Sequence, residues 1–281
     1  MIGINIGAGF CNRIFQMVFA YATARKYDIM FRFENWKIAS HHSYQIYDWL
    51  VERFMKTQWY YNEQISYDME YKEPYDKFLT YLDIEKEIPT IKDKAVLIPY
   101  GFFQNEKYFK EYRLEILELL KEPVYITSYL NKAYVQIIPF IENSYFLHIR
   151  LGDYLMNQKH FIYLDKYYET CLKNIAEKDS QAKIVIFSNE PTKIGRIYPG
   201  LIEQLNQYNF EFITLNEPDE VATFYLMQRC CKGGICSNST YGWWAGWLNT
   251  YEDKQIYMPS KWINMELVND IYPEGTYIVE V

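Results

Sequence analysis

Residues 146–154 read Phe-Leu-His-Ile-Arg-Leu-Gly-Asp-Tyr, so an apolar run delivers His, Arg, Asp and Tyr into one short segment. The apolar positions predict a buried strand, and Gly152 predicts a tight turn after it. The guanidinium of Arg150 is a planar fork of donors that fits two phosphate oxygens at once, and Asp153 follows three residues later. In open α/β sheets, ligands bind just beyond the carboxyl ends of the strands. The stretch therefore predicts either a phosphate-binding site or a structural Arg150–Asp153 ion pair that stabilises the turn.

Around this stretch, predicted strands alternate with predicted helices. Strands are expected at residues 1–6, 95–100, 145–149, 183–187, 210–215 and 234–237. Helices are expected from residue 12 onward and at 48–54, 77–82, 106–121, 167–177, 201–206, 220–231 and 242–248. This alternation predicts an α/β fold with parallel sheets and helices on both faces. A break near residues 131–143, which contains Pro139, predicts two lobes, 1–138 and 139–281.

Composition restricts the partners. The chain has 281 residues, of which 49% are hydrophobic, so it can bury a large core. Its net charge is −7 and it has no Lys/Arg-rich run, which argues against nucleic acid as a partner. The 29 tyrosines combine ring area with a hydroxyl, the chemistry that stacks on sugars and bases.

Cysteine usage and the N-terminus bear on the compartment. The five cysteines are odd in number, and Cys230 and Cys231 are adjacent, so we expect no disulfide framework. The first residues predict a strand and a turn rather than a signal peptide, and no apolar stretch approaches a membrane-spanning length. We expect a soluble, cytoplasmic protein without a transmembrane segment, while its oligomeric state is not predicted.

A glycine-containing turn follows the first predicted strand. Gly7 and Gly9 precede Asn12, which stands where the dinucleotide-binding fingerprint has its third glycine. Glu34 lies near the position of a ribose-binding acid. The same glycines also suit a plain strand-to-helix turn, with Asn12 as the cap of the helix or facing a ligand at its positive end. A dinucleotide-dependent oxidoreductase is therefore one alternative reading of the chain.

Two later segments also place polar groups after predicted strands. Ser188 and Glu190 fall on the same sheet edge as Arg150, where they could bind a base or ribose or cap the next helix. Residues 233–249 predict a short strand, a Ser-Asn-Ser-Thr loop and a helix with three tryptophans. Ser239 and Thr240 at the start of that helix suit an anion site. The spacing of the tryptophans predicts core packing rather than a sugar platform.

Five motifs in order give the chain a family resemblance. It resembles the α-1,2-fucosyltransferases of glycosyltransferase family 11 over nearly its whole length. The matching segments are Gly7–Gln16, Gly101–Phe109, His148–Tyr154, Asn238–Leu248 and Met258–Trp262. The chain departs from the family pattern at Arg13, at Leu151 and at Asn189-Glu190, which leaves open a donor other than GDP-fucose.

The resemblance implies a GT-B fold, with two Rossmann-like lobes and a cleft between them. It implies that the C-terminal lobe binds the donor nucleotide and the N-terminal lobe binds the acceptor, shaped by residues 36–94. The reaction implied is transfer of L-fucose, with inversion, from GDP-fucose to the 2-hydroxyl of a galactose-type acceptor glycan. The implied catalytic residues are Arg150, Asp153 and His148. The implied substrate-binding residues are Gly9, Asn12, Gln16, Ser188, Glu190, Asn238, Ser239 and Thr240.

The residues themselves add one expectation about cofactors. No Asp-x-Asp pair occurs in the chain, so we expect no metal and no other cofactor, with Arg150 supplying the positive charge for a departing diphosphate. A different nucleotide-activated 6-deoxyhexose, linked to UDP or dTDP, is an alternative donor. A non-catalytic glycan-binding protein is a third reading, and the presence of Arg150 and Asp153 counts against it.

Overall fold

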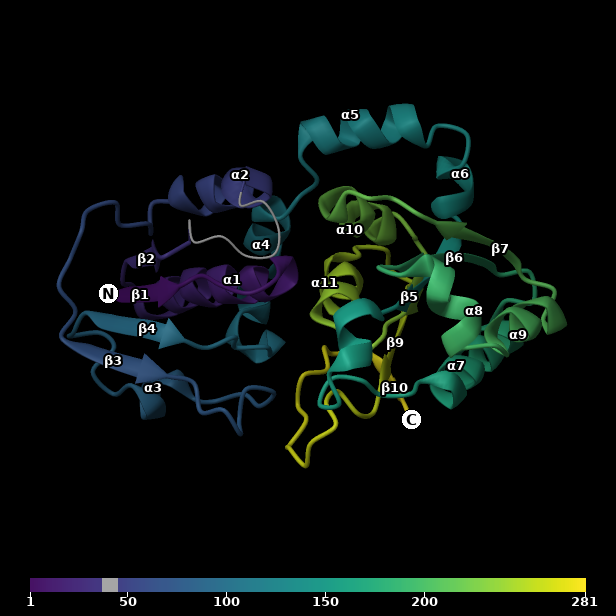
Figure 1. Cartoon of the computed structure of the whole chain (residues 1–281). Coiled ribbons are helices and arrows are strands. Elements are labelled where there is room, and N and C mark those ends of the chain that lie inside the picture. The colour runs from purple at the N-terminus through teal and green to yellow at the C-terminus, as the bar shows by residue number, and fades with distance from the viewer. Residues whose placement is uncertain (37–44) are drawn as a thin grey trace. The chain divides into compact units, whose positions relative to one another are not determined.

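The computed structural model describes residues 1–36 and 45–281, which form two compact units (Figure 1). The N-terminal unit comprises Met1–Lys121 together with Leu267–Ile271. The C-terminal unit comprises Glu122–Glu266 together with Tyr272–Val281. Residues 37–44, part of the region expected to shape the acceptor site, lie outside the described residues.

A parallel sheet forms the centre of the N-terminal unit. Its strand order is β2 (Phe31–Glu34), β1 (Ile2–Asn5), β4 (Val96–Tyr100) and β3 (Met69–Lys72). In register, Ile2 pairs with Phe31 on one side and with Val96 on the other. The chain leaves β1 for β2 on one side and returns to its other side with β4. The topological switch point, where α/β sheets bind ligands, therefore lies between β1 and β4.

Helix α1 (Phe10–Tyr27) follows β1 and is buried over most of its length. Its apolar residues recur at helical spacing, which the sequence predicted. The helix begins at Gly9, which has no side chain to serve as a cap, and Asn12 lies inside the first turn. Asn12 is thus not the N-cap, contrary to prediction. The helix ends at Asp28, which adopts the left-handed conformation with φ 55°.

Five shorter helical segments complete this unit, and two predictions fail there. The elements are α2 (Gln45–Met55), α3 (Ile84–Glu87), η1 (Glu106–Tyr108), η2 (Lys110–Tyr112) and α4 (Arg113–Leu119). The single helix predicted at 106–121 is broken at Phe109, whose backbone is not helical (φ −145°, ψ −3°) and whose ring is buried in the core. The helix predicted at 77–82 is wrong. That segment forms turns, with Lys77 N donating to Pro74 O and Thr80 N donating to Lys77 O.

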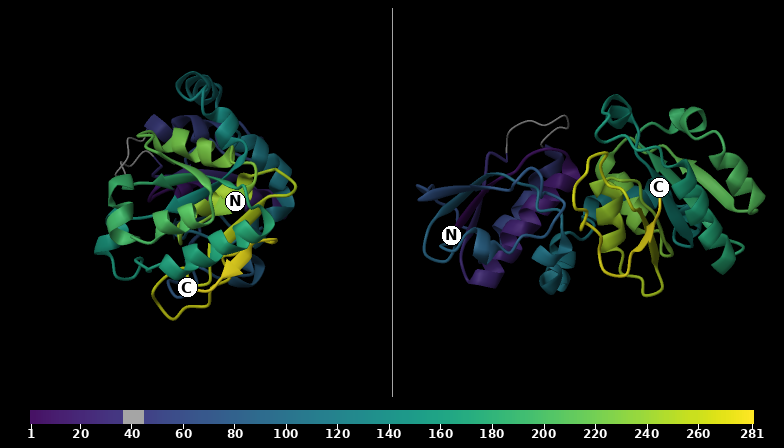
Figure 2. Two further views of the ribbon diagram at one scale, coloured as in Figure 1. Left: turned by 90° about the vertical axis from the view of Figure 1, so that its right-hand side faces the viewer. Right: turned by 90° about the horizontal axis from the view of Figure 1, so that it is seen from below.

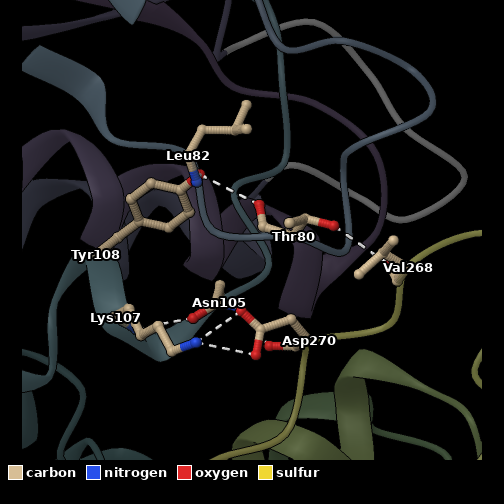
Figure 3. A network of polar contacts seen from close by, with 7 residues as sticks. All are labelled: Thr80, Leu82, Asn105, Lys107, Tyr108, Val268 and Asp270. Atoms are coloured by element: carbon tan, nitrogen blue, oxygen red, sulfur yellow. Dashed lines mark hydrogen bonds and ion pairs between the residues drawn. The ribbon is translucent and has the colours of Figure 1, made fainter. Parts of the chain in front are cut away.

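The segment Leu267–Ile271, here called the strap, is separated in sequence from the rest of the N-terminal unit but packs within it. Figure 3 shows its polar contacts. The carboxylate of Asp270 accepts from Lys107 Nζ at 2.7 and 2.9 Å, and Asn105 Nδ2 donates to Asp270 O at 2.5 Å. Thr80 Oγ1 donates to Val268 O at 3.2 Å. The strap therefore fixes both the 74–82 turns and the start of η1.

The C-terminal unit also contains a parallel sheet. Its strand order is β10 (Tyr277–Val279), β9 (Gln255–Pro259), β8 (Gly233–Ile235), β5 (Ser144–Ile149), β6 (Lys183–Ser188) and β7 (Glu211–Leu215). From β5 the chain adds β6 and β7 on one side, then returns to the other side with β8. The switch point lies between β5 and β8. A Cβ on Gly234 would lie 2.4 Å from Phe146 O, so only glycine permits these two strands to pack as they do.

Helices cover both faces of this sheet, as predicted (Figure 1 and Figure 2). The helices α7 (Asp165–Lys178), α8 (Ile194–Ile197) and α9 (Leu201–Gln207) share a core with Tyr145, Leu147 and Ile149 of β5. Because side chains alternate along a strand, the intervening residues of β5 face the opposite side, where α11 (Thr240–Leu248) lies with α10 (Glu220–Gln228). The remaining elements are α5 (Val124–Ala133), α6 (Ile138–Ile141), η3 (Gly152–Met156) and η4 (Pro191–Lys193).

The division between the units falls at Lys121/Glu122, earlier than the predicted boundary at 138/139. Helix α5 belongs to the C-terminal unit because it contacts α10. In addition, the hydroxyls of Tyr129 and Tyr134 donate to the carboxylate of Glu217 at 2.8 and 2.5 Å. None of the described helices is both long and apolar enough to cross a membrane.

Candidate active site

Arg150 follows β5 directly at the carboxyl edge of the C-terminal sheet, beside the switch point. Its Nη2 lies 2.5 Å from Asp153 Oδ1, and its Cζ lies 5.1 Å from the centroid of the Tyr154 ring. Among the described residues, no acceptor pairs with its buried Nε. The Asp153 side chain is 69% exposed, so it can turn into solvent and release the guanidinium. The predicted Arg150–Asp153 pair is present, and one donor of the guanidinium remains available to a ligand.

The turn that carries Arg150 is held by Asn189, which follows β6. Asn189 Oδ1 accepts from Leu151 N at 2.9 Å. Gly152 adopts φ 61°, and a Cβ there would lie 2.3 Å from Asn189 Nδ2. Glycine is thus required both for the backbone conformation and for the close approach of Asn189. Asn189 positions the Arg150 turn, a role that the sequence analysis did not predict.

His148 lies on the face of β5 that packs against α11. It is buried, and its Nδ1 lies 3.0 Å from Ser237 Oγ. Burial and the neighbouring Arg150 lower its pKa to about 3, so the imidazole is neutral at ordinary pH. A buried neutral imidazole is a weak proton acceptor. The geometry therefore gives His148 a positioning part between β5 and β8, together with Ser237, which the sequence analysis missed.

The start of α11 forms the other side of this edge. Ser239 is the N-cap, and its Oγ accepts from Tyr241 N at 3.4 Å. Thr240 is the first residue of the helix and is partly exposed. Asn238 is buried, and its Nδ2 donates to His160 O at 2.8 Å and to Trp262 O at 3.0 Å. Its amide thus fixes the loop, whereas Ser239 and Thr240 lie at the positive end of α11.

The tryptophans of α11 are buried, as predicted. Trp243 and Trp244 form an edge-to-face pair with ring centroids 4.9 Å apart, and Trp247 lies 5.3 Å from Trp244. These rings anchor the helix in the core and thereby fix the position of its N-terminus.

Ser188 and Glu190 lie at the same edge, after β6. Ser188 Oγ accepts from Glu190 N at 3.1 Å, which is a local turn contact. Glu190 Oε1 lies 3.0 Å from Lys193 Nζ. Both side chains are partly exposed. The edge therefore brings together Arg150, Asp153, His148, Ser188, Glu190, Asn238, Ser239 and Thr240.

The other predicted residues lie at the carboxyl edge of the N-terminal sheet. Gln16 is buried, with Oε1 accepting from Gly7 N at 2.8 Å and Nε2 donating to Gly101 O at 2.9 Å. Its amide ties the end of β1 to the end of β4, so its contacts are structural. Asn12 Oδ1 accepts from Gln104 Nε2 at 2.9 Å. Gly9 is exposed at the start of α1.

Glu34, which the oxidoreductase reading assigns to ribose, has other partners. Its Oε1 lies 2.6 Å from Arg32 Nε and accepts from the Tyr67 hydroxyl at 2.7 Å. Both contacts fall on Oε1, so Arg32 and Tyr67 fix the orientation of the Glu34 carboxylate while Oε2 keeps its acceptor sites.

Glu73 is a further residue at this edge that the sequence analysis did not single out. It follows β3, is buried, and accepts from Phe102 N at 2.7 Å and from Phe103 N at 3.0 Å. Burial raises its pKa to about 7, although the two backbone donors favour the carboxylate. Phe103 adopts φ 52°, a conformation that favours glycine, and Glu73 holds it there. Only the fold brings Glu73 to this loop, so no local sequence signal marks it.

Metal-ligating groups and thiols complete the description of the candidate sites. Within residues 1–36 and 45–281 no group of three or more His, Cys, Asp or Glu side chains is arranged to hold a metal ion. All five cysteines lie in this part of the chain and are free, as expected.

Comparison with known families assigns the chain. The model of glycosyl transferase family 11 matches residues 85–272, which include Arg150, Asp153 and the start of α11. The chain belongs to glycosyl transferase family 11. The predicted resemblance is thereby confirmed, although the Gly7–Gln16 motif lies outside the matched residues.

Two curated Escherichia coli proteins are similar to this family 11 chain. The O-antigen biosynthesis glycosyltransferase WbnK is 29% identical over 58% of the chain and 54% of its own length. An alpha-1,2-colitosyltransferase is 26% identical over 62% of the chain and 58% of its own length. The chain thus spans little more than half the length of the curated relatives it matches.

A solved structure agrees on the fold. A mutant of Arabidopsis thaliana FUT1 in complex with GDP superposes with a TM-score of 0.52, covering 92% of the chain and 69% of that protein, at 11% identity. This likeness, with the two units described above, confirms the predicted α/β architecture of GT-B type.

Proposed function

We propose that the chain is an inverting glycosyltransferase that transfers L-fucose from GDP-fucose to the 2-hydroxyl of a galactose-type acceptor glycan. The observation that carries this proposal is Arg150 at the β5/β8 switch point, with a buried Nε that has no acceptor among the described residues. Family membership supports the transferase class. The relatives' names support a sugar transferred to a glycan.

In the proposed reaction, the donor diphosphate binds at the edge of the C-terminal unit. Its oxygens accept from Arg150 and from groups at the start of α11, where Ser239 and Thr240 lie. Asp153 leaves Arg150 as the diphosphate binds, which its exposure permits. Negative charge grows on the departing diphosphate as the bond from the anomeric carbon to its oxygen breaks. A fixed guanidinium stabilises that charge more in the transition state than in the ground state.

The acceptor hydroxyl attacks the anomeric carbon from the face opposite the diphosphate. A new carbon–oxygen bond forms, the configuration inverts, and the hydroxyl proton passes to a base. We assign that base to Asp153, whose carboxylate becomes free once the diphosphate has replaced it on Arg150. His148 and Asn238 position the site, and Ser188 and Glu190 lie where they can contact the base or ribose.

The proposed acceptor side is the N-terminal unit. There Gly9 and Asn12 line the carboxyl edge of the sheet, and Gln16 fixes its shape. We propose that the reaction needs no cofactor, since Arg150 supplies the charge that a metal would otherwise supply. Turnover with and without a chelator should therefore be equal, and loss of turnover in EDTA would contradict this part of the proposal.

A second donor class has specific support. One relative is named as a colitosyltransferase, and Asn189-Glu190 departs from the family pattern beside the donor site. Asn189 Oδ1 holds the Arg150 turn, which leaves the amide nitrogen of Asn189 and the carboxylate of Glu190 to select a base in this proposal. A transferase for colitose, or for another deoxyhexose linked to UDP or dTDP, is the alternative.

Calorimetric titration of the chain with GDP, UDP, dTDP and NAD in turn tests the proposal. We expect selective GDP binding that Arg150→Ala abolishes. Lys173→Ala removes one exposed positive charge from α7 and is the matched control. It should bind GDP like the unmodified chain.

The outcomes separate the readings. A preference for UDP or dTDP would retain the transferase and replace fucose as the donor sugar. Binding of NAD alone would overturn the transferase. Equal loss of GDP binding in Arg150→Ala and Lys173→Ala would show a general charge effect and contradict the assigned role of Arg150.

A further inference from the structure

Residues 101–105, here called the β4–η1 loop, are held by a carboxylate from a different strand. The backbone N–H groups of Phe102 and Phe103 donate to the two oxygens of the Glu73 carboxylate at 2.7 and 3.0 Å. Adjacent backbone N–H groups that point into one concavity form an anion-binding arrangement. Here the anion is the buried side chain of Glu73, which follows β3. Glu73 therefore fixes the middle of the loop from outside it.

Phe103 needs this support because its backbone is left-handed. Its φ is 52°, in a region that residues with a side chain seldom adopt and that costs free energy. Its ring stacks on that of Phe19 in α1, with centroids 3.6 Å apart and planes 5° apart. The hydrogen bond from Phe103 N to Glu73 and the stacked ring together offset the cost of the backbone conformation.

Gln104 carries the conformation of the loop to α1. It follows Phe103 directly and is buried, so the direction of its side chain depends on the backbone of Phe103. Its Nε2 donates to Asn12 Oδ1 at 2.9 Å. Because Oδ1 takes this bond, the amide nitrogen of Asn12 points away from Gln104, and no residue in the described part of the chain accepts from it. Asn12 is partly exposed, so a fixed amide donor is available at the sheet edge.

The two ends of the β4–η1 loop are held independently of Glu73. Gly101 O accepts from Gln16 Nε2 at 2.9 Å. Asn105 Nδ2 donates to Asp270 O of the strap at 2.5 Å, a contact that can be followed in Figure 3. Loss of the Glu73 carboxylate should therefore release residues 102–104 while the ends of the loop stay in place.

We propose that Glu73 is a positioning residue for the reaction. By holding Phe102 and Phe103 it sets the direction of Gln104 and, through Gln104, of the Asn12 amide that donates to the substrate at this edge. That the substrate bound there is the acceptor rests on the proposed function. The chain of contacts from Glu73 to Asn12 lies entirely within the N-terminal unit.

The charge of Glu73 makes this positioning sensitive to pH. The carboxylate accepts both backbone bonds, whereas protonation turns one of its oxygens into a donor. Burial raises the pKa of Glu73 to about 7. The titratable groups that face it are Tyr71 of β3, Tyr100 of β4 and Tyr108 of η1, and burial raises the pKa of each above its ordinary value of 10. The tyrosines stay neutral where Glu73 titrates, so Glu73 is the member of this cluster that changes charge near pH 7.

Side-chain amide NMR of the full chain tests the positioning without any substrate. We expect the Nδ2 resonances of Asn12, assigned by their loss in Asn12→Ser, to shift as the pH passes through 7. Glu73→Gln places an amide donor against a backbone donor and should abolish the shift. Glu70→Gln makes the same chemical change at an exposed position of β3 and should retain it. Asn12 resonances that do not respond to pH and are identical in Glu73→Gln and Glu70→Gln would overturn the proposal.

Kinetics with GDP-fucose and methyl β-D-galactopyranoside test the consequence for the reaction. Glu73→Gln should raise KM for the galactoside about tenfold, the equivalent of one well-placed hydrogen bond, and leave kcat largely unchanged. In a Gln104→Met background, Glu73→Gln should have no further effect, because its influence passes through Gln104. Additive effects of the two changes, or equal KM values in Glu73→Gln and Glu70→Gln, would overturn the proposal.

The two measurements separate this inference from the proposed function. An Asn12 shift that depends on Glu73, without turnover of GDP-fucose in any variant, would support the positioning and contradict the proposed donor. Turnover together with Asn12 resonances that are independent of Glu73 would retain the proposed function and overturn the inference. The pH titration of the unmodified chain needs no variant, so the test remains decisive if Glu73→Gln does not fold.

Discussion

The carboxyl edges of the two sheets differ in kind although each lies at a switch point. At the C-terminal edge, Arg150 presents a guanidinium beside a capped helix start. At the N-terminal edge, the amides of Gln16 and Gln104 tie the loops together. The comparison teaches that one repeated architecture can present a guanidinium at one edge and hydrogen-bonded amides at the other.

The two arginines that follow the first strand of each unit give the sharpest test of this contrast. Arg13 is buried and its Nε donates to Ala8 O at 2.9 Å, so its role is structural. Arg150→Lys retains a charge but loses the fork, and we expect turnover to fall by about a hundredfold or more. Arg13→Lys should lower stability by about 1 kcal/mol and leave turnover per folded molecule largely intact. Steady-state kinetics and urea unfolding of both variants measure these effects. Near-normal turnover in Arg150→Lys would contradict the proposed binding of the diphosphate by the guanidinium of Arg150.

The units should respond to pH in opposite directions. Burial raises the pKa of Glu73 to about 7 from an ordinary 4.5, so its contribution to stability is present below pH 4.5 and is lost as the pH rises to 7. The pKa of His148 is lowered from 6.5 to about 3, so its contribution is present above pH 6.5 and is lost as the pH falls toward 3. The shifts correspond to roughly 3 kcal/mol for Glu73 and roughly 5 kcal/mol for His148.

Chemical unfolding across pH 4–8 checks these slopes. Glu73→Gln should flatten the fall in stability between pH 4.5 and 7, and His148→Asn should flatten the fall below pH 6.5. Each variant serves as the control for the other, because the two groups lie in different units. Identical pH profiles for Glu73→Gln and the unmodified chain would contradict the raised pKa.

The side-chain amides of Gln16 and Asn189, which hold loops at the two sheet edges, should differ in their contribution to stability. Gln16→Leu leaves Gly7 N and Gly101 O without their partner and should cost about 2 kcal/mol. Asn189→Ala removes the hydrogen bond from Leu151 N and should cost about 1 kcal/mol. Asn189→Ala should nevertheless reduce turnover more, because it loosens the turn of Arg150. Thermal unfolding measures the loss of stability in both variants, and activity assays measure their loss of turnover. A larger loss of turnover in Gln16→Leu than in Asn189→Ala would contradict the role of Asn189 in holding the Arg150 turn.

The strap should give the smallest effect. Asp270→Asn weakens the ion pair with Lys107, which is partly exposed, and we expect a loss of less than about 1 kcal/mol. The loss should affect the N-terminal unit alone, measured by hydrogen exchange of the 74–82 turns. Lys86→Ala, which removes an exposed ion pair with Asp83 in the same unit, is the control. Faster exchange in the C-terminal sheet instead would contradict the placement of the strap.

Much of the C-terminal unit could be predicted from sequence because its signals are local. The apolar runs of β5 and β6 are continuous, as expected of strands covered on both faces, and helices of clear periodicity separate the strands. Polar residues directly after β5 and β6 had to fall on one edge, so the sequence predicts Arg150 and Ser188 together.

The N-terminal unit was less predictable because its irregular segments depend on distant partners. Strands β2 and β3 are short and were not predicted, since each obtains its hydrogen bonds from a neighbouring strand rather than from its own pattern. The 74–82 turns depend on the strap, and no local signal in either segment indicates that they meet.

The sequence by itself determined the α/β class, the family resemblance and the presence of a guanidinium after a buried strand, because periodicity and motif order are properties of neighbouring residues. The tertiary structure alone decided that Gln16, Asn189 and His148 hold the edges. It also decided that Glu73 lies buried and accepts from Phe102 N and Phe103 N. Those roles come from hydrogen bonds and burial between segments far apart in the chain, which local spacing does not encode.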